Sequence, residues 1–144
     1  FRPGYILFRQ DPKRPPNQLG IAHREGWVAY HLGTTLFIKR FDRVENGCYP
    51  DGGVNFETFS NEEILELESL GPLTTLAPGR SVIHRETWSL HRNVPPCRTE
   101  ADFARIAKLA ANADRTSQQP RLNAGAAGTA ALPGVAPHSS RGYS

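Results

Sequence analysis

Two neighbouring glutamates offer the clearest chemistry in this sequence. Glu66 and Glu68 lie in the run Leu65–Ser69, in which apolar and acidic residues alternate. Side chains on a β-strand alternate between faces, so both carboxylates are expected on one face, beside each other. Repulsion within such a pair raises the pKa of one group, and the pair can act as a general base or accept hydrogen bonds from ligand hydroxyls. The alternative is the solvated outer face of an edge strand.

A third carboxylate is expected close to this pair. Asn55 and Glu57 share a face if residues 55–60 form a strand, and a hairpin with a strand at 64–70 would place Glu57 near the two glutamates. Three carboxylates on one face repel one another, so they require a ligand, a cation or basic partners. Asn55 and Glu57 are therefore candidate ligand-binding residues.

Lys39 and Arg40 are the candidate basic partners of these carboxylates. They follow the apolar run Leu36–Ile38, so one of them is placed to emerge into a pocket. The alternative is a strand end whose charged groups reach solvent. Both interpretations stay open from the sequence.

A histidine and a tryptophan share one face of the last expected strand. His84, Glu86 and Trp88 are spaced two residues apart. Histidine titrates near neutral pH, so His84 is a candidate acid or base, although a strand histidine is more often structural. The rings of Trp27 and Trp88 could stack on the apolar face of a sugar, whereas a tryptophan between two sheets is more often part of the core.

The elements that must position these side chains are short strands. Residues 1–92 contain apolar or alternating runs separated by Pro, Gly, Asn and Asp, which is typical of all-β folds. The run at 36–41 is apolar on both faces, and this favours a strand covered on both sides in an antiparallel β-sandwich. The expected strands are Tyr5–Arg9, Gln18–Ala22, Gly26–Leu32, Thr35–Arg43, Asn55–Ser60, Ile64–Leu70 and Ser81–Arg92.

Turn residues separate these runs. His31–Thr34 predicts a hairpin turn, Tyr49–Gly53 a turn or loop, and Ala77–Gly79 a type II turn with Pro and Gly at its preferred positions. We therefore expect one β-sandwich domain over residues 1–114.

One short helix and a tail complete the expected organisation. Residues 99–113 predict a helix with Thr99 as N-cap and Asp102 in a capping-box position. Its apolar face comprises Phe103, Ile106, Ala107 and Ala110. Residues 115–144 are rich in Ala, Gly, Ser and Pro and predict a disordered tail.

Charge distribution argues against a nucleic-acid partner. The pI is about 9.1 and the net charge is +3, but residues 1–114 carry 14 basic and 14 acidic residues. The whole excess lies in the tail, whereas a basic recognition face belongs on the folded part. No apolar run approaches the ~18 residues of a membrane span, so no membrane partner is expected either.

Metal and nucleotide sites are not indicated by any motif. Cys48 and Cys97 are too few for a disulfide framework and form no CxxC motif, so two free thiols and no zinc site are expected. No glycine-rich phosphate loop, GxSxG or HExxH sequence is present. We expect no cofactor and no metal, although a carboxylate cluster could hold calcium. The compartment stays open, with the cytoplasm slightly favoured.

Three runs in order resemble the end of aldose 1-epimerase-like proteins, within the galactose-mutarotase-like superfamily. The runs are Leu65–Pro72, Leu76–Gly79 and His84–Trp88, and Tyr49–Gly53 with Asn55–Phe59 resemble a bacterial branch of that superfamily. The resemblance covers roughly residues 5–110. It implies the C-terminal half of a β-supersandwich that binds sugars on a concave face.

The resemblance also implies roles for individual residues. In that superfamily a late-strand glutamate takes the proton of the anomeric hydroxyl, and a histidine protonates the ring oxygen. Glu68 matches the base by position, and Glu66 is the register-shifted second choice. The family's acid histidine lies upstream, and neither His23 nor His31 matches it. The expected sugar contacts are Glu57, Asn55, Lys39, His84 and Trp88.

Three functions stay open at this stage. The complete protein would interconvert sugar anomers, or bind carbohydrate without catalysis, or serve as a structural sandwich domain. The chain begins with Phe, lacks Met and has about half the family's length, so we expect a fragment that is inactive by itself. A half sandwich exposes an apolar face, which predicts self-association.

Overall fold

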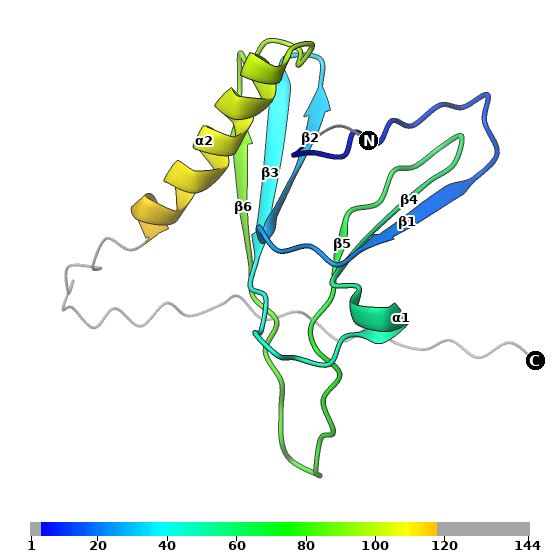
Figure 1. The fold of residues 1–144 in the computed structure, drawn as a ribbon, viewed down its shortest axis with the longest axis vertical. Helices are drawn as coiled ribbons and strands as arrows, with labels where there is room; N and C mark the ends of the chain where they lie inside the picture. The colour runs from blue at the N-terminus through cyan, green and yellow to red at the C-terminus, as the bar shows by residue number, and fades with distance from the viewer. Residues whose placement is uncertain (1–3, 118–144) are drawn as a thin grey trace, which may run out of the picture.

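The computed structural model describes residues 4–117 as two antiparallel three-stranded sheets and one long C-terminal helix (Figure 1). The prediction of a mostly β-structure with a C-terminal helix is confirmed. One sheet has the strand order β2-β3-β6 and the other β1-β4-β5. The strands are β1 (Asn17–Ile21), β2 (Trp27–Leu32), β3 (Thr35–Phe41), β4 (Phe56–Ser60), β5 (Glu68–Ser69) and β6 (Glu86–His91), with a single turn α1 (Pro50–Gly53) before β4 and α2 (Glu100–Ser117) last.

The β2-β3-β6 sheet has β3 at its centre. The β2–β3 hairpin turns at Gly33, whose φ of 61° suits glycine, and this confirms the predicted hairpin. The strand β3 is paired on both edges, and residues on both of its faces are buried, as its apolar sequence predicts. Leu36 and Ile38 project to one face, and Phe37 and Lys39 to the other.

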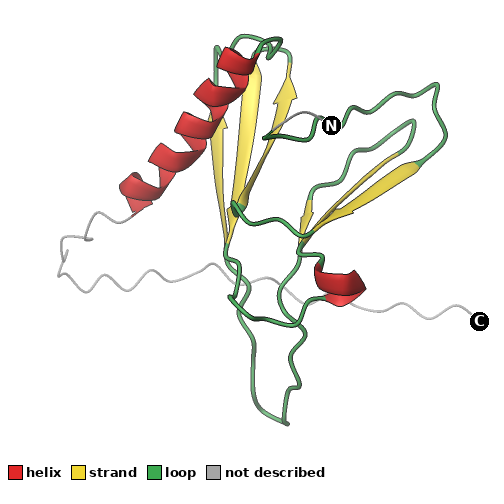
Figure 2. Cartoon of the chain, viewed as in Figure 1, coloured by secondary structure: helices red, strands yellow, loops and turns green. Residues whose placement is uncertain are grey.

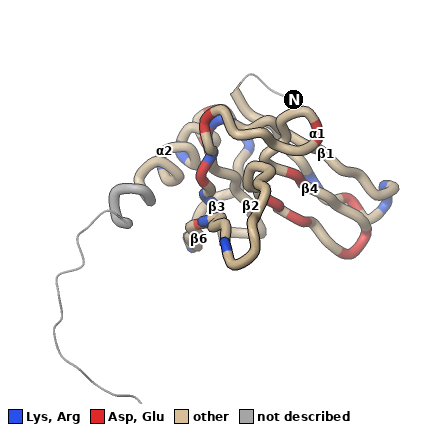
Figure 3. Tube along the Cα trace, turned by 90° about the horizontal axis from the view of Figure 1, so that it is seen from below, with Lys and Arg blue, Asp and Glu red and all other residues tan. Residues whose placement is uncertain are grey.

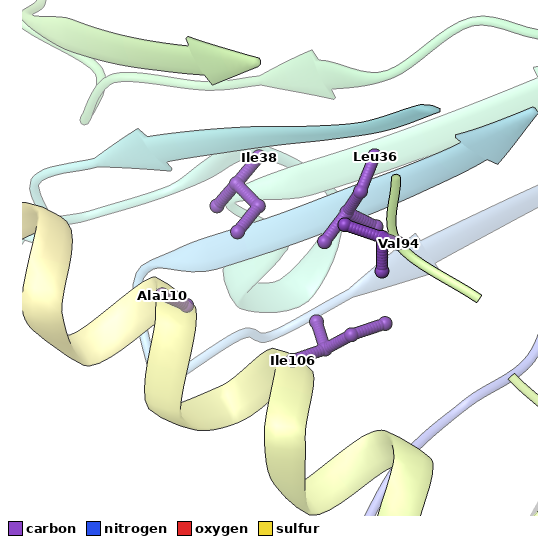
Figure 4. Close-up of a cluster of buried hydrophobic side chains, with 5 residues drawn as sticks. All are labelled: Leu36, Ile38, Val94, Ile106 and Ala110. Carbon is purple, nitrogen blue, oxygen red and sulfur yellow. The ribbon is translucent and has the colours of Figure 1, made fainter. Parts of the chain in front are cut away.

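Helix α2 packs on the first of these faces and forms the main core. Leu36 and Ile38 are fully buried against Ile106 and Ala110 of the helix, with Val94 at the edge (Figure 4). Trp27, Ala29, Cys97 and Leu109 complete this cluster. The amphipathic helix thus buries the apolar stripe that it could not keep stable alone.

The second sheet faces the other side of β3. Phe41 stacks on Phe56 of β4 with ring centroids 5.9 Å apart, and His23 contacts both rings. From this contact the two sheets diverge, as Figure 1 shows. The strand β3 lies between helix α2 on one side and the β1-β4-β5 sheet on the other. The predicted hairpin between residues 55–60 and 64–70 is confirmed, with Glu57 opposite Glu68.

Several expected strands are shorter or absent. Residues 5–9 form no strand, because Tyr5 instead stacks on Phe103 of α2 at 3.9 Å. Only Glu68–Ser69 of the expected 64–70 strand is regular, preceded by a bridge from Ser60 to Leu65. The last strand begins at Glu86 instead of Ser81.

The connection between β5 and β6 is a long loop that projects away from both sheets (Figure 2). Its tip is the predicted type II turn, in which Gly79 has a φ of 76° and the Arg80 amide donates to the Ala77 carbonyl at 3.1 Å. Tyr49–Gly53, predicted as a turn or loop, contains α1, with left-handed φ values at Asp51 and Gly52.

Helix α2 is longer than predicted. Its capping box is as expected, since the Thr99 amide donates to Asp102 at 2.9 Å and the Asp102 amide to the Thr99 hydroxyl at 3.3 Å. The helix continues to Ser117 instead of ending at residue 113, because no Gly or Pro interrupts it. Ala107 is exposed, and Leu109 takes its expected place against the sheet. The rest of the expected tail, residues 118–144, lies outside the described residues.

A partly buried histidine closes the turn that leads into β2. Nδ1 of His23 accepts the Gly26 amide at 3.1 Å, which requires an unprotonated Nδ1. Burial lowers the pKa of His23, and the charge of Glu25 opposes this shift. The folded protein therefore disfavours the charged imidazole.

This lowered pKa predicts a pH-dependent stability. The unfolded chain takes up the His23 proton near pH 6.5 and the folded chain only at lower pH, so stability falls as pH decreases below about 6.5. Urea unfolding between pH 7 and pH 5 measures this loss, and His23→Gln is expected to flatten the curve. An equal slope in the wild type and the variant would show that another group causes the loss.

Candidate functional site

A buried lysine organises the space where the two sheets meet. Lys39 on β3 is only 6% exposed. Its Nζ lies 2.7 Å from Oε1 of Glu86 on β6 and donates to the Leu67 carbonyl at 2.8 Å. The sequence-based alternative of a strand end reaching solvent is therefore wrong for Lys39. The lysine links three segments that are far apart in the chain.

Ser69 and His84 extend this network. The Ser69 hydroxyl donates to Oε1 of Glu86, and its oxygen lies 2.7 Å from Nε2 of His84. Because the single hydroxyl proton goes to Glu86, Nε2 of His84 must be the donor. A protonated Nε2 cannot take a proton from Ser69, so this arrangement does not activate a serine nucleophile.

The surroundings of Glu86 favour the ionised form of its carboxyl group. Burial by itself would raise the pKa of this carboxyl, but hydrogen bonds from Lys39, Ser69 and Trp88 and the lysine charge outweigh it, so the pKa is lowered. A charged acceptor is therefore held in place over the neutral pH range.

Trp88 lies beside this carboxylate and faces solvent. Its Nε1 donates to Oε2 of Glu86 at 2.9 Å, and its ring meets the edge of Phe37 at 5.7 Å. The side chain is nevertheless 66% exposed. An indole fixed at one edge with an open face is a preformed platform for an apolar ligand surface. Lys39, Ser69, His84, Glu86 and Trp88 are called the Lys39 cluster below.

The predicted glutamate pair lies next to the Lys39 cluster. The carboxyls of Glu66 and Glu68 are hydrogen-bonded to each other, and this bond, partial burial and the Glu66 charge raise the pKa of Glu68. The nearby Lys39 charge acts in the opposite direction. Glu57 lies opposite Glu68 and accepts the Gln18 amide at 3.0 Å. The expected proximity of Glu57 to Glu68 is confirmed, but the ion-pair partner of Lys39 is Glu86 and not one of these three carboxylates. Glu66 and Glu68 are exposed, and β5 is an edge strand.

Asn55 is placed differently from the expectation. It is 1% exposed, its Oδ1 accepts the His23 amide at 2.5 Å and its Nδ2 donates to the His23 carbonyl at 2.8 Å. A ligand cannot reach this side chain, so the expected sugar contact at Asn55 is not supported. Its amide instead joins the turn before β2 to the start of β4.

Two residues of the Lys39 cluster were not selected from the sequence. The alternating pattern of Leu65–Ser69 puts Ser69 on the apolar side of its strand, and the spacing of Glu86 indicates only that it shares a face with His84 and Trp88. The two-residue spacing of His84, Glu86 and Trp88 was the available signal. The sequence contains no such signal for Ser69, because its partners His84 and Glu86 belong to the segment of the other sheet.

No metal or membrane feature is visible in residues 4–117. No group of three or more His, Cys, Asp and Glu side chains in this range is arranged to hold a metal ion. Neither of the described helices is both long and apolar enough to cross a membrane. Cys48 and Cys97 are free thiols, and burial, together with the charge of Asp102, raises the pKa of Cys97.

No protein-family model matches this chain, and comparisons with curated proteins and with solved structures gave no match. The resemblance to aldose 1-epimerase-like proteins therefore stays a prediction.

Proposed function

We propose that this chain contributes a carbohydrate-binding surface centred on Trp88 and Glu86. The main observation that supports this proposal is the indole of Trp88, which is 66% exposed and donates a hydrogen bond to the ionised carboxylate of Glu86. Sugars present an apolar C–H face and a ring of hydroxyls, so they suit an aromatic platform bordered by fixed polar groups. Trp88 takes the apolar face, and Glu86 and His84 take hydroxyls.

The network behind the platform supports this proposal. Lys39 is buried and fixes Glu86, while Ser69 connects Glu86 to His84. These side chains need not be ordered when a ligand arrives, which lowers the entropic cost of binding. Glu57, Glu66 and Glu68 add hydroxyl acceptors at the neighbouring sheet edge.

The sequence resemblance points to the same class of ligand. We propose that the two sheets are part of a mutarotase-like β-sandwich, in which the divergent sheets border the sugar surface. The expected self-association through an exposed apolar face stays a prediction. Leu32 and Leu90, 67% and 63% exposed, are available for it on the same face of the sheet as Trp88.

Removal of the indole tests the binding proposal. Trp88→Ala is expected to weaken binding of the best aldose by about tenfold, because the stacking platform is lost. Saturation-transfer NMR over a panel of common aldoses identifies that sugar, and a chemical-shift titration measures its affinity.

The matched control is Leu73→Ala, since Leu73 is 64% exposed but lies in the loop between β5 and β6. It should leave the affinity unchanged. If Trp88→Ala binds the sugar as strongly as the wild type does, Trp88 is not the stacking platform. If the wild type binds no aldose at all, the proposal of a carbohydrate-binding surface is wrong.

Anomer interconversion is a second candidate function, favoured by the raised pKa of Glu68. A carboxyl that is hydrogen-bonded to Glu66 and has a raised pKa is suited to exchange protons with an anomeric hydroxyl. The role of base matches the position implied by the resemblance. The acid partner is not identified in this chain.

The variant Glu68→Gln distinguishes sugar binding alone from anomer interconversion. If Glu68 is the base, the variant is expected to slow anomer exchange, followed by NMR of the sugar, by at least about a hundredfold. Sugar affinity should change little, because the amide still hydrogen-bonds hydroxyls. Unchanged exchange with intact binding would assign the surface to binding alone.

A further inference from the structure

A pocket lies on the opposite face of the β2-β3-β6 sheet from the Lys39 cluster. It has a volume of about 300 Å³ and is formed where the turn before β2, the residues after β3 and the start of β6 meet. Arg40 and Thr87 are paired across β3 and β6, so they project to the same face. Lys39 projects to the other face, which separates the two sites.

The backbone around this pocket is held tightly. The Phe41 amide donates to the Gly26 carbonyl at 2.9 Å and so joins the turn to the end of β3. Gly26 has a φ of 67°, and a Cβ there would lie 2.8 Å from the Phe41 carbonyl oxygen. Only glycine fits this position, so the pocket wall has a defined shape.

The lining of the pocket is rich in arginine. Four arginines from three separate segments and two acidic residues line the pocket, so basic residues outnumber acidic ones there, and Thr87 adds a hydroxyl group. In the rest of the described chain, acidic and basic residues are interspersed (Figure 3). The charged lining residues are Arg24, Arg40, Arg43, Arg85, Glu25 and Asp42.

We propose that this pocket binds the phosphate group of a small molecule. Guanidinium groups present paired N–H donors that match two phosphate oxygens, and they remain charged at all relevant pH values. A volume of about 300 Å³ is at the lower end of small-ligand pockets, so the phosphate and a small attached group fill it. The proposal is independent of sugar binding at Trp88.

Isothermal titration with inorganic phosphate at fixed ionic strength tests this site. The test variant is Arg43→Gln/Arg85→Gln, since both side chains are exposed and their removal leaves the core intact. It is expected to weaken phosphate binding by about tenfold or more. Unchanged thermal unfolding of the variant shows that the fold is kept.

The control variant removes the same charge elsewhere. Arg80→Gln/Arg92→Gln changes two exposed arginines outside the pocket and should bind phosphate as the wild type does. No saturable phosphate binding by the wild type, or equal weakening in both double variants, would overturn the proposal.

Glycerol 3-phosphate provides a second arm of the titration. Tighter binding than inorganic phosphate, lost in Arg43→Gln/Arg85→Gln, supports a phosphomonoester as the ligand. Equal affinity for both compounds supports free phosphate. Both results depend on the same arginines and differ only in the source of the phosphate group.

Discussion

Ile38→Ala is expected to lower the free energy of unfolding by about 3–4 kcal/mol. Ile38 is fully buried between β3 and α2, and it shares its core with Leu36, Ile106 and Ala110. The substitution removes apolar contacts and leaves a cavity that a sheet paired on both edges cannot close. Urea unfolding followed by circular dichroism measures the change.

Ile83→Ala is the matched control, because this isoleucine is 79% exposed in the loop between β5 and β6. The same chemical change there should alter stability by less than about 0.5 kcal/mol. A loss of similar size in both variants would mean that α2 does not cover β3 as described.

Lys39→Met is expected to destabilise the protein by about 3 kcal/mol. The variant keeps the length and the apolar stem of the side chain but leaves the partly buried Glu86 carboxylate without its cation. The Leu67 carbonyl also loses its donor. Chemical unfolding at pH 7, where Glu86 is ionised, measures the change.

The double variant Lys39→Met/Glu86→Gln shows the origin of this loss. A neutral amide needs no cation, so the double variant should recover part of the stability lost in the single variant. If the two substitutions are instead additive, the destabilisation does not come from an uncompensated charge and the Lys39 cluster is not coupled as described.

The sheet elements were predictable where local sequence decides them. The β2–β3 hairpin follows from its turn at Gly33 and from apolar residues on both faces of β3. The capping box of α2 follows from Thr99 and Asp102, whose side chains contact neighbouring backbone groups. Such features depend on interactions within a few residues.

Elements that depend on distant contacts were predicted less well. Tyr5 lies in a run that alternates like a strand, yet it packs on Phe103 and donates to Glu100 of α2. Residues 81–85 lack a partner strand along their length, so the apolar pattern of Val82 and Ile83 does not produce a ladder. A strand pattern specifies a strand only where a neighbour can pair with it.

The difference between local and distant contacts also explains which residues of the candidate site could be predicted. Glu57 and Glu68 could be placed together because a hairpin relates them. Lys39, Ser69 and Glu86 come from three segments that meet through the contact between sheets, which no local pattern encodes. Asn55 failed as a surface candidate because its buried amide satisfies the His23 backbone.

The central claim is that a sugar stacks on Trp88, and the two indole N–H signals in a ¹⁵N–¹H NMR spectrum test it most directly. Trp27 is packed in the core under α2, whereas Trp88 is exposed and donates to Glu86. Titration with the best-binding aldose should shift the Trp88 signal in a saturable manner and leave the Trp27 signal in place. A saturable shift elsewhere in the spectrum with an unmoved Trp88 signal would contradict the account.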